Sequence, residues 1–129
     1  MFAFSVEVGL PFEQAIEKFT QSLTAEKMGV VSDIDVQAIM KAKLGHDMPA
    51  YRILGACAPS LARRVIEAEP DAGSLLPCGV AVMAIDAGHT RFAFQDPEKL
   101  ASMVDSPVMH EVAKEARAML LRVKDRLAG

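Results

Sequence analysis

Two cysteines, Cys57 and Cys78, are the side chains in this 129-residue sequence that are best placed to do chemistry. Cys57 is the last residue of an apolar segment that includes Gly55. Two residues later comes Pro59, where a helix can begin. Cys78 follows Pro77 at the start of a later apolar run. If the two runs are neighbouring antiparallel strands, the end of one lies beside the start of the other, and strand alternation is expected to turn both thiols to one face. The sequence therefore predicts a two-thiol site at one edge of the core, with Gly55, Pro59 and Pro77 setting the backbone around it.

Two neighbouring thiols can bind a soft metal ion, form a reversible disulfide or hold a thiol-reactive ligand. The helix start after Cys57 favours a thiolate there. Two thiolates suffice for a linear copper(I) ion, with Met83 or a histidine nearby, whereas zinc needs four ligands that no CxxC or HxxxH spacing supplies. Cysteine is also among the most buried residue types, so plain packing in the core and a structural disulfide stay open as alternatives.

Other polar residues have simpler explanations than catalysis. His89 lies at an expected hairpin turn, His46 follows Gly45 in a loop, and no histidine has a nucleophile or an orienting carboxylate next to it. His110 lies near the edge of the apolar stripe of the last helix. Asp33 and Asp35 alternate outward along an expected strand and solubilise it. Neither a glycine-rich phosphate loop nor a G-x-S-x-G turn is present, and the eight methionines are scattered as gap-filling core residues are.

Composition narrows the class of protein. The chain has 14 basic and 17 acidic residues, for a formal net charge of −3, which argues against nucleic acid and against a polybasic membrane anchor as partners. The longest apolar stretch, residues 75–85, is interrupted by Pro77 and Gly79 and is shorter than the roughly 20 residues of a spanning helix. Two cysteines are too few for a secreted disulfide framework, and the first residues lack the basic start of a signal peptide. We expect one domain over residues 1–129, in the cytoplasm and with reduced thiols.

Hydrophobic periodicity predicts nine elements in the order β-α-β-(short α)-β-α-β-β-α. Residues 2–8 alternate as a strand does, and the last helix, after Pro107, carries an apolar stripe at helical spacing. The turn residues Asp86 and Gly88 join two strands in a hairpin. The expected fold is α+β, a mainly antiparallel sheet with helices packed on one face. The expected strands cover 2–8, 30–36, 51–57, 75–85 and 90–95, and the expected helices cover 12–23, 37–44, 59–69 and 108–127.

Strand alternation also predicts an uncharged second face of the sheet. In the fourth strand Leu76, Cys78, Val80 and Val82 are expected to face the core, which leaves Pro77, Gly79, Ala81 and Met83 on the other side. Neighbouring strands are expected to add Ala3, Leu54, Ala56 and Ala93 to that side. Because a largely uncharged face is more often covered than bare, we expect a homodimer through this open face.

The two cysteine segments, Tyr51-Arg52-Ile53-Leu54-Gly55-Ala56-Cys57-Ala58-Pro59 and Leu75-Leu76-Pro77-Cys78, carry a family resemblance. With Met28-Gly29-Val30-Val31 and Lys41-Ala42-Lys43-Leu44-Gly45, they make nearly the whole chain resemble the bacterial and archaeal family called domain of unknown function 302. The resemblance implies a fold similar to the TATA-box-binding-protein-like class, frequent dimers, no settled biochemical function and, for some relatives, an association with sulfur compounds or metals. The family pattern usually has asparagine at the position of Ala58, after the first cysteine, and often has asparagine at the position of Gly79, after the second.

These observations favour a non-catalytic domain that binds a small ligand or a soft metal ion, copper(I) or zinc, at Cys57 and Cys78. One alternative is a thiol-dependent enzyme or sulfur carrier, with Cys57 as the nucleophile and Cys78 as the resolving thiol. Another is a structural module that acts only through the open sheet face.

Overall fold

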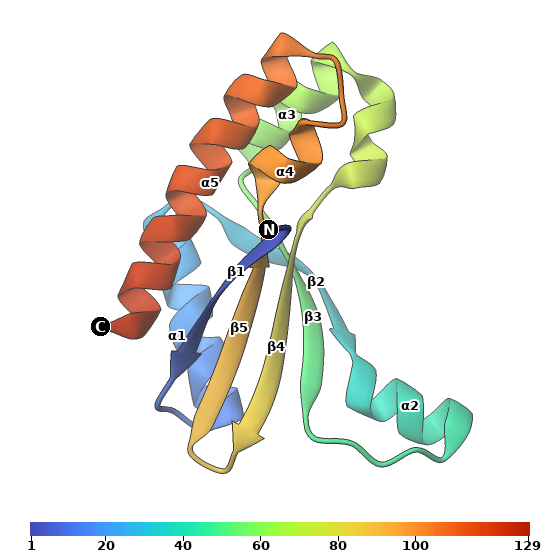
Figure 1. Ribbon diagram of the computed structural model, residues 1–129, viewed down its shortest axis with the longest axis vertical. Coiled ribbons are helices and arrows are strands. Elements are labelled where there is room, and N and C mark those ends of the chain that lie inside the picture. The colour runs from blue at the N-terminus through green and yellow to red at the C-terminus, as the bar shows by residue number, and fades with distance from the viewer.

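The structure is a computed structural model that describes all residues from 1 to 129, and its centre is one five-stranded sheet (Figure 1). The strands lie side by side in the order β1-β5-β4-β3-β2, and all neighbours are antiparallel. This confirms the predicted α+β class with a mainly antiparallel sheet. The strands are β1 (Ala3–Val8), β2 (Gly29–Asp35), β3 (Tyr51–Cys57), β4 (Cys78–Asp86) and β5 (His89–Gln95).

Helices cover one face of this sheet and extend past one of its ends. Helices α1 and α5 pack against the strands and each other, whereas α3, η1 and α4 gather around α5 beyond the strand ends (Figure 1). Helix α2 lies beyond the sheet edge and buries none of its residues. None of the helices combines the length and the apolar character needed to span a membrane. The helices are α1 (Phe12–Ala25), α2 (Val36–Leu44), α3 (Pro59–Ala68), the 3₁₀ helix η1 (Pro70–Leu75), α4 (Pro97–Ala101) and α5 (Pro107–Ala128).

The core between the sheet and the helices is built on a cluster of phenylalanine rings. The Phe19 ring on α1 lies 5.2 Å from Phe92 and 6.0 Å from Phe94 on β5, and all three are fully buried. Burying an aromatic side chain contributes on the order of 1.5–3 kcal/mol, so these contacts hold α1 on the sheet.

The faces of β4 are as predicted, but those of β3 are not. Val80 and Val82 are buried while Ala81 and Met83 lie on the open side. Leu54 and Ala56, expected on the open side, are only 1% exposed and belong to the core. They pair with Val80 and Cys78 in the ladder, and directly paired residues share a face.

Two further boundaries differ from the expectation. The predicted strand 75–85 begins only at Cys78, because η1 ends at Leu75 and Pro77 has no N–H to give to the ladder. The Leu76-Pro77 peptide bond is cis. Residues 97–101, expected as part of a turn, form α4, whose N-terminus is capped by the Asp96 carboxylate accepting from the Glu98 N–H at 3.0 Å.

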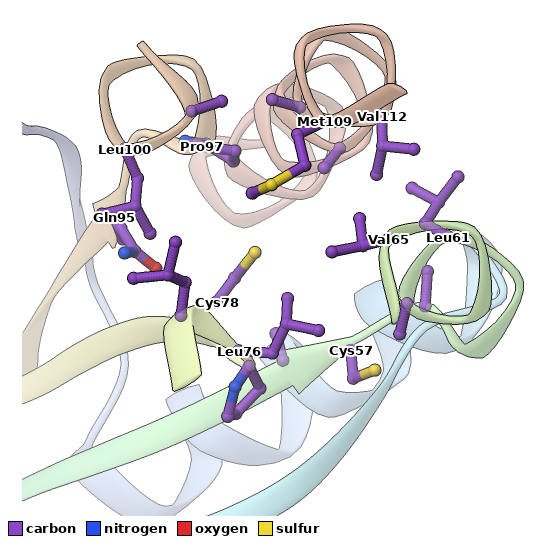
Figure 2. Close-up of a pocket in the computed structure, with 18 of the residues that line it drawn as sticks. Cys57, Leu61, Val65, Leu76, Cys78, Gln95, Pro97, Leu100, Met109 and Val112 are labelled. Atoms are coloured by element: carbon purple, nitrogen blue, oxygen red, sulfur yellow. The ribbon is translucent and has the colours of Figure 1, made fainter. Parts of the chain in front are cut away.

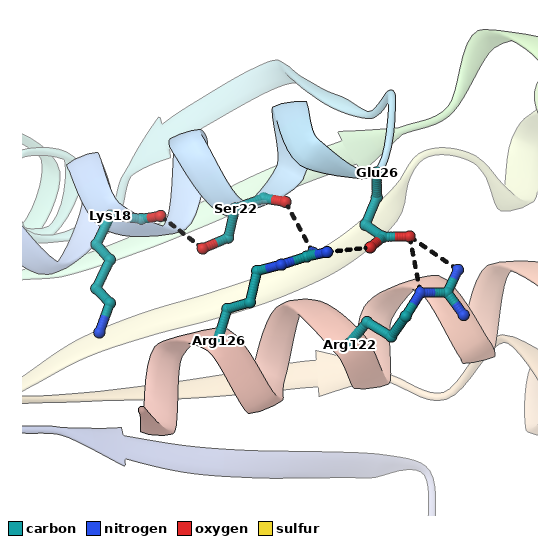
Figure 3. Close-up of polar contacts among 5 residues, drawn as sticks. All are labelled: Lys18, Ser22, Glu26, Arg122 and Arg126. Atoms are coloured by element: carbon teal, nitrogen blue, oxygen red, sulfur yellow. Dashed lines mark hydrogen bonds and ion pairs between the residues drawn. The ribbon is translucent and has the colours of Figure 1, made fainter.

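A cluster of charges joins the C-terminal halves of α1 and α5 (Figure 3). The Glu26 carboxylate accepts hydrogen bonds from Arg122 Nε at 2.9 Å and pairs with Arg126 Nη2 at 2.7 Å. The Glu26 side chain is only 8% exposed. Lys18 Nζ donates to the Gly129 carbonyl at 2.9 Å, so α1 holds the end of α5 at several points.

Candidate functional site

A cavity of about 70 Å³ lies where β3 and β4 meet the helices α3, α4 and α5 (Figure 2). Sixteen of its 19 lining residues are hydrophobic, and both cysteines are among the 19. The lining contains no Asp, Glu, His, Lys or Arg; its polar groups are the Gln95 amide and the two thiols. The cavity is therefore suited to uncharged or soft ligands rather than to ions that need oxygen donors.

Cys78 and Cys57 border this cavity with different orientations. Cys78 pairs with Ala56 on the core face, and Figure 2 shows its sulfur pointing into the cavity. Cys57 comes one residue after Ala56, so ladder alternation turns it the other way, and in Figure 2 its sulfur points away from that of Cys78. The expectation that both thiols face the same way is therefore wrong, although the structure does bring both residues to one cavity. Opposed side-chain directions also disfavour a disulfide between them, and both cysteines are free.

Burial raises the pKa of both thiols. Desolvation raises the pKa of Cys57 above its ordinary value. Desolvation, and then repulsion from Cys57, raises the pKa of Cys78 to about 11. The start of α3 does not reverse this at Cys57, because Pro59 at the first helical position has no N–H to offer a thiolate. Both side chains are therefore protonated thiols at neutral pH, contrary to the thiolate expected at Cys57.

Gly55 and Pro77 shape the backbone beside the thiols. A Cβ atom at Gly55 would collide with Ser32 Oγ and with the Pro77 ring, so glycine is what lets Pro77 pack against β3. Across the ladder Gly79 pairs with Gly55, and its N–H donates to Gln95 Oε1 at 3.0 Å. The predicted framing residues thus lie around the cysteines, and whether the thiols bind a ligand stays a prediction.

Two methionines that the sequence did not single out also line the cavity, Met28 and Met109. Figure 2 shows the Met109 and Cys78 side chains pointing toward one another. Knowledge of the antiparallel pairing would have placed Met28 near the cysteines, because Met28 directly precedes Gly29 and Gly29 pairs with Cys57. Met83, named as a possible neighbour of the thiols, pairs with Tyr51 and Arg91 on the open face and lies on the wrong side of the sheet.

The remaining polar candidates make contacts within the fold or lie exposed on the surface. His110 Nε2 lies 3.0 Å from the Ala101 carbonyl and 2.7 Å from the Val104 carbonyl, fixing the connection from α4 to α5. His89 Nδ1 lies 2.8 Å from Asp86 Oδ1 in the exposed β4–β5 turn. Asp33 pairs with Arg52 at 3.5 Å, Asp35 caps α2, and His46 is exposed after that helix. No three His, Cys, Asp or Glu side chains converge in a way that could hold a metal ion.

Comparison with known proteins identifies the family. The family described as "Domain of unknown function DUF302" matches residues 4–127. The crystal structure of an uncharacterized conserved DUF302 protein from Bacillus stearothermophilus is similar over 98% of both chains, with 30% sequence identity and a TM-score of 0.88. No curated protein matches the chain. Both matches span nearly all of the sheet and helices around the cavity, and the chain belongs to the DUF302 family.

Proposed function

We propose that this protein is a non-catalytic binding domain whose ligand occupies the cavity beside Cys78. The observation that carries the proposal is a preformed apolar cavity with one thiol pointing into it. Its volume of about 70 Å³ is several times the roughly 10–15 Å³ that a single water needs, so it has room for a ligand of a few heavy atoms. Apolar walls with a few inward polar groups are typical of small-molecule sites.

The thiol-enzyme alternative finds less support. A cysteine nucleophile needs a lowered pKa or a neighbouring base, whereas burial raises the pKa of Cys57 and Cys78. The cavity wall offers no histidine, carboxylate or lysine that could take the proton. A packed thiol beside a bound molecule suits these surroundings better than a reacting one.

The compartment that suits this site is a reducing one. Cys57 and Cys78 are both free and point apart, and thiols stay reduced in the cytoplasm. We therefore include a cytoplasmic location in the proposal.

Small apolar probes test the cavity directly. Benzene and dimethyl sulfide, added to the ¹⁵N-labelled protein, should shift amide signals of α3, α5 and the start of β4. Ala113→Leu, which fills the cavity wall, should abolish these shifts. The matched control Ala118→Leu lies on the same helix but outside the cavity and should keep them. Absence of shifts in the unmodified protein at saturating probe, or equal shifts in both variants, would contradict the proposal.

A second role belongs to the open face of the sheet, for which we propose a second copy of the chain as the partner. The face carries Ala81, Ala93, Tyr51 and Ile53, and a groove of about 510 Å³ runs across it. Its charged side chains are balanced in sign, since Glu7 and Arg91 lie 3.8 Å apart and both Asp96 and Lys99 line the groove, so two copies would meet without a large net like-charge repulsion. Five strands of about seven residues present an area on the order of 600 Å², which approaches the roughly 800 Å² that each partner of a standard interface buries.

A further inference from the structure

We propose that the cavity binds one copper(I) ion between the Cys78 thiolate and the Met109 thioether, with Met28, also in the cavity wall, available as a third sulfur donor. This inference rests on the cavity being the binding site proposed above. It adds the class of ligand and the residues that hold it.

Sulfur is concentrated at this cavity. The chain has eight methionines and two cysteines, and four of these ten residues are among the 19 that line the cavity. Met28 lies between α1 and β2, Cys57 ends β3, Cys78 begins β4, and Met109 is in the first turn of α5. Because they come from four separate segments, no periodicity along one element accounts for their convergence.

The two principal donors sit on fixed backbone. Cys78 is held in the ladder opposite Ala56. The Met109 N–H donates to Ser106 Oγ at 3.3 Å, and this hydrogen bond caps the N-terminus of α5. Figure 2 shows their side chains directed toward one another across the cavity, and donors on rigid elements are what a defined metal site needs.

The apolar lining favours copper(I) over zinc, and one thiolate over two as its ligands. Thiolate and thioether sulfur prefer copper(I), which needs few ligands. When copper(I) binds, the Cys78 S–H bond breaks, its proton goes to solvent, and a copper–sulfur bond forms without any change in oxidation state. One thiolate with neutral thioethers then gives a complex of zero net charge, which an apolar cavity accepts at little cost. Two thiolates would leave a net charge of −1, and zinc with one thiolate would leave a net charge of +1.

Anaerobic titration with copper(I), in competition with a chromophoric copper(I) chelator, tests the site. We expect one copper(I) per chain and an ultraviolet thiolate-to-copper charge-transfer band. Cys78→Ser and Cys78→Ala should both abolish the band. Met109→Leu, which conserves volume, should weaken binding roughly tenfold or more, since even indirect contacts of a metal site are worth about 10–100-fold. Met83→Leu on the open face is the matched control and should bind as the unmodified protein does.

Three outcomes would overturn the inference: no tight binding, binding that both Cys78 variants retain while folded by circular dichroism, or Met109→Leu binding as tightly as Met83→Leu. Cys57→Ser should still bind one copper(I) ion. If Cys57→Ser instead loses copper(I) binding as completely as Cys78→Ser does, the ion is held by two thiolates and the inference is overturned. The benzene experiment separates the two proposals. Benzene binding without copper(I) binding removes only the metal, whereas loss of both removes the cavity as a binding site.

Discussion

Each cysteine has its own surroundings, and these should set how fast it reacts. Because burial raises the pKa of Cys57 and raises that of Cys78 to about 11, only a small fraction of either thiol is ionised at pH 7, and the thiolate is the reactive form. We expect slow alkylation of both by iodoacetamide at pH 7, with the Cys78 rate still rising between pH 9 and about pH 11. Mass spectrometry of Cys57→Ser and Cys78→Ser separates the two rates. A rate for Cys78 that levels off below pH 8 would contradict the raised pKa.

Glu26 should make stability depend on acidity. Hydrogen bonds from Arg122, and then from Arg126, lower the pKa of this carboxyl below its ordinary value, against the desolvation that raises it. A pKa lowered by folding stabilises the protein above the unfolded-state pKa of about 4.3, and the stabilisation is lost as the pH falls through the lower folded-state pKa.

Glu26→Gln should therefore lower the free energy of unfolding at pH 7 by about 1–3 kcal/mol, and the difference from the unmodified protein should shrink below about pH 4. Urea unfolding at several pH values measures this. The control Glu67→Gln removes the exposed i,i+4 pair with Arg63 and should cost under about 0.5 kcal/mol. Equal effects of the two substitutions would show that the Glu26 cluster adds nothing.

The β3–β4 ladder has two glycines opposite each other, and only one of them has room for a larger side chain. A Cβ at Gly55 would meet Ser32 and Pro77, whereas a Cβ at Gly79 has nothing within 4 Å. Gly55→Ala should destabilise the fold by about 1–3 kcal/mol, the usual cost of overpacking, and Gly79→Ala should cost less. Thermal unfolding of the two variants compares them, and equal melting temperatures would show that Pro77 is not wedged against β3.

Local patterns predicted most elements but not the side of every residue. The order of elements and the faces of β4 followed from alternation, because large Val80 and Val82 contrast with small Gly79 and Ala81. In β3 both Ile53 and Leu54 are apolar, so alternation has no contrast to use and predicts the wrong face for Leu54 and Ala56. The pairing of β3 with β4 resolves the phase, and pairing is a long-range property.

The candidate site was predictable to the same extent. Cys57 and Cys78 border one cavity because β3 and β4 are antiparallel neighbours, a pairing that the hydrophobic pattern allows but does not establish. Their side chains point in opposite directions because Cys78 pairs with Ala56 and not with Cys57, and a shift of one residue in this pairing would reverse that. Met109 reaches the cavity because α5 folds back over α3 and α4, and its place in an amphipathic helix marks it only as a core residue.

The open sheet face should determine the oligomeric state of the protein. Ala81 lies at the middle of that face, paired with Ile53 and Ala93. Ala81→Glu would bury an unpaired charge in a face-to-face dimer, yet in a monomer it would stay in water. We expect sedimentation velocity at micromolar concentration to give a dimer for the unmodified protein and a monomer for Ala81→Glu. The control Ile66→Glu, on the exposed side of α3, should stay dimeric, and a monomeric unmodified protein would refute the interface.

The two halves of α5 are held by different neighbours: Glu26, which follows α1, holds the C-terminal half, and α3 and α4 hold the N-terminal half. Its 22 residues span about 33 Å, with Arg122 and Arg126 tied to Glu26 near one terminus and Met109 over the cavity near the other. We expect amide hydrogen exchange to be slowest in α1 and the C-terminal turns of α5, and faster in α3, η1 and α4. A guest molecule would then enter by brief opening of α3, η1 or α4 beside α5, while the phenylalanine core stays closed throughout.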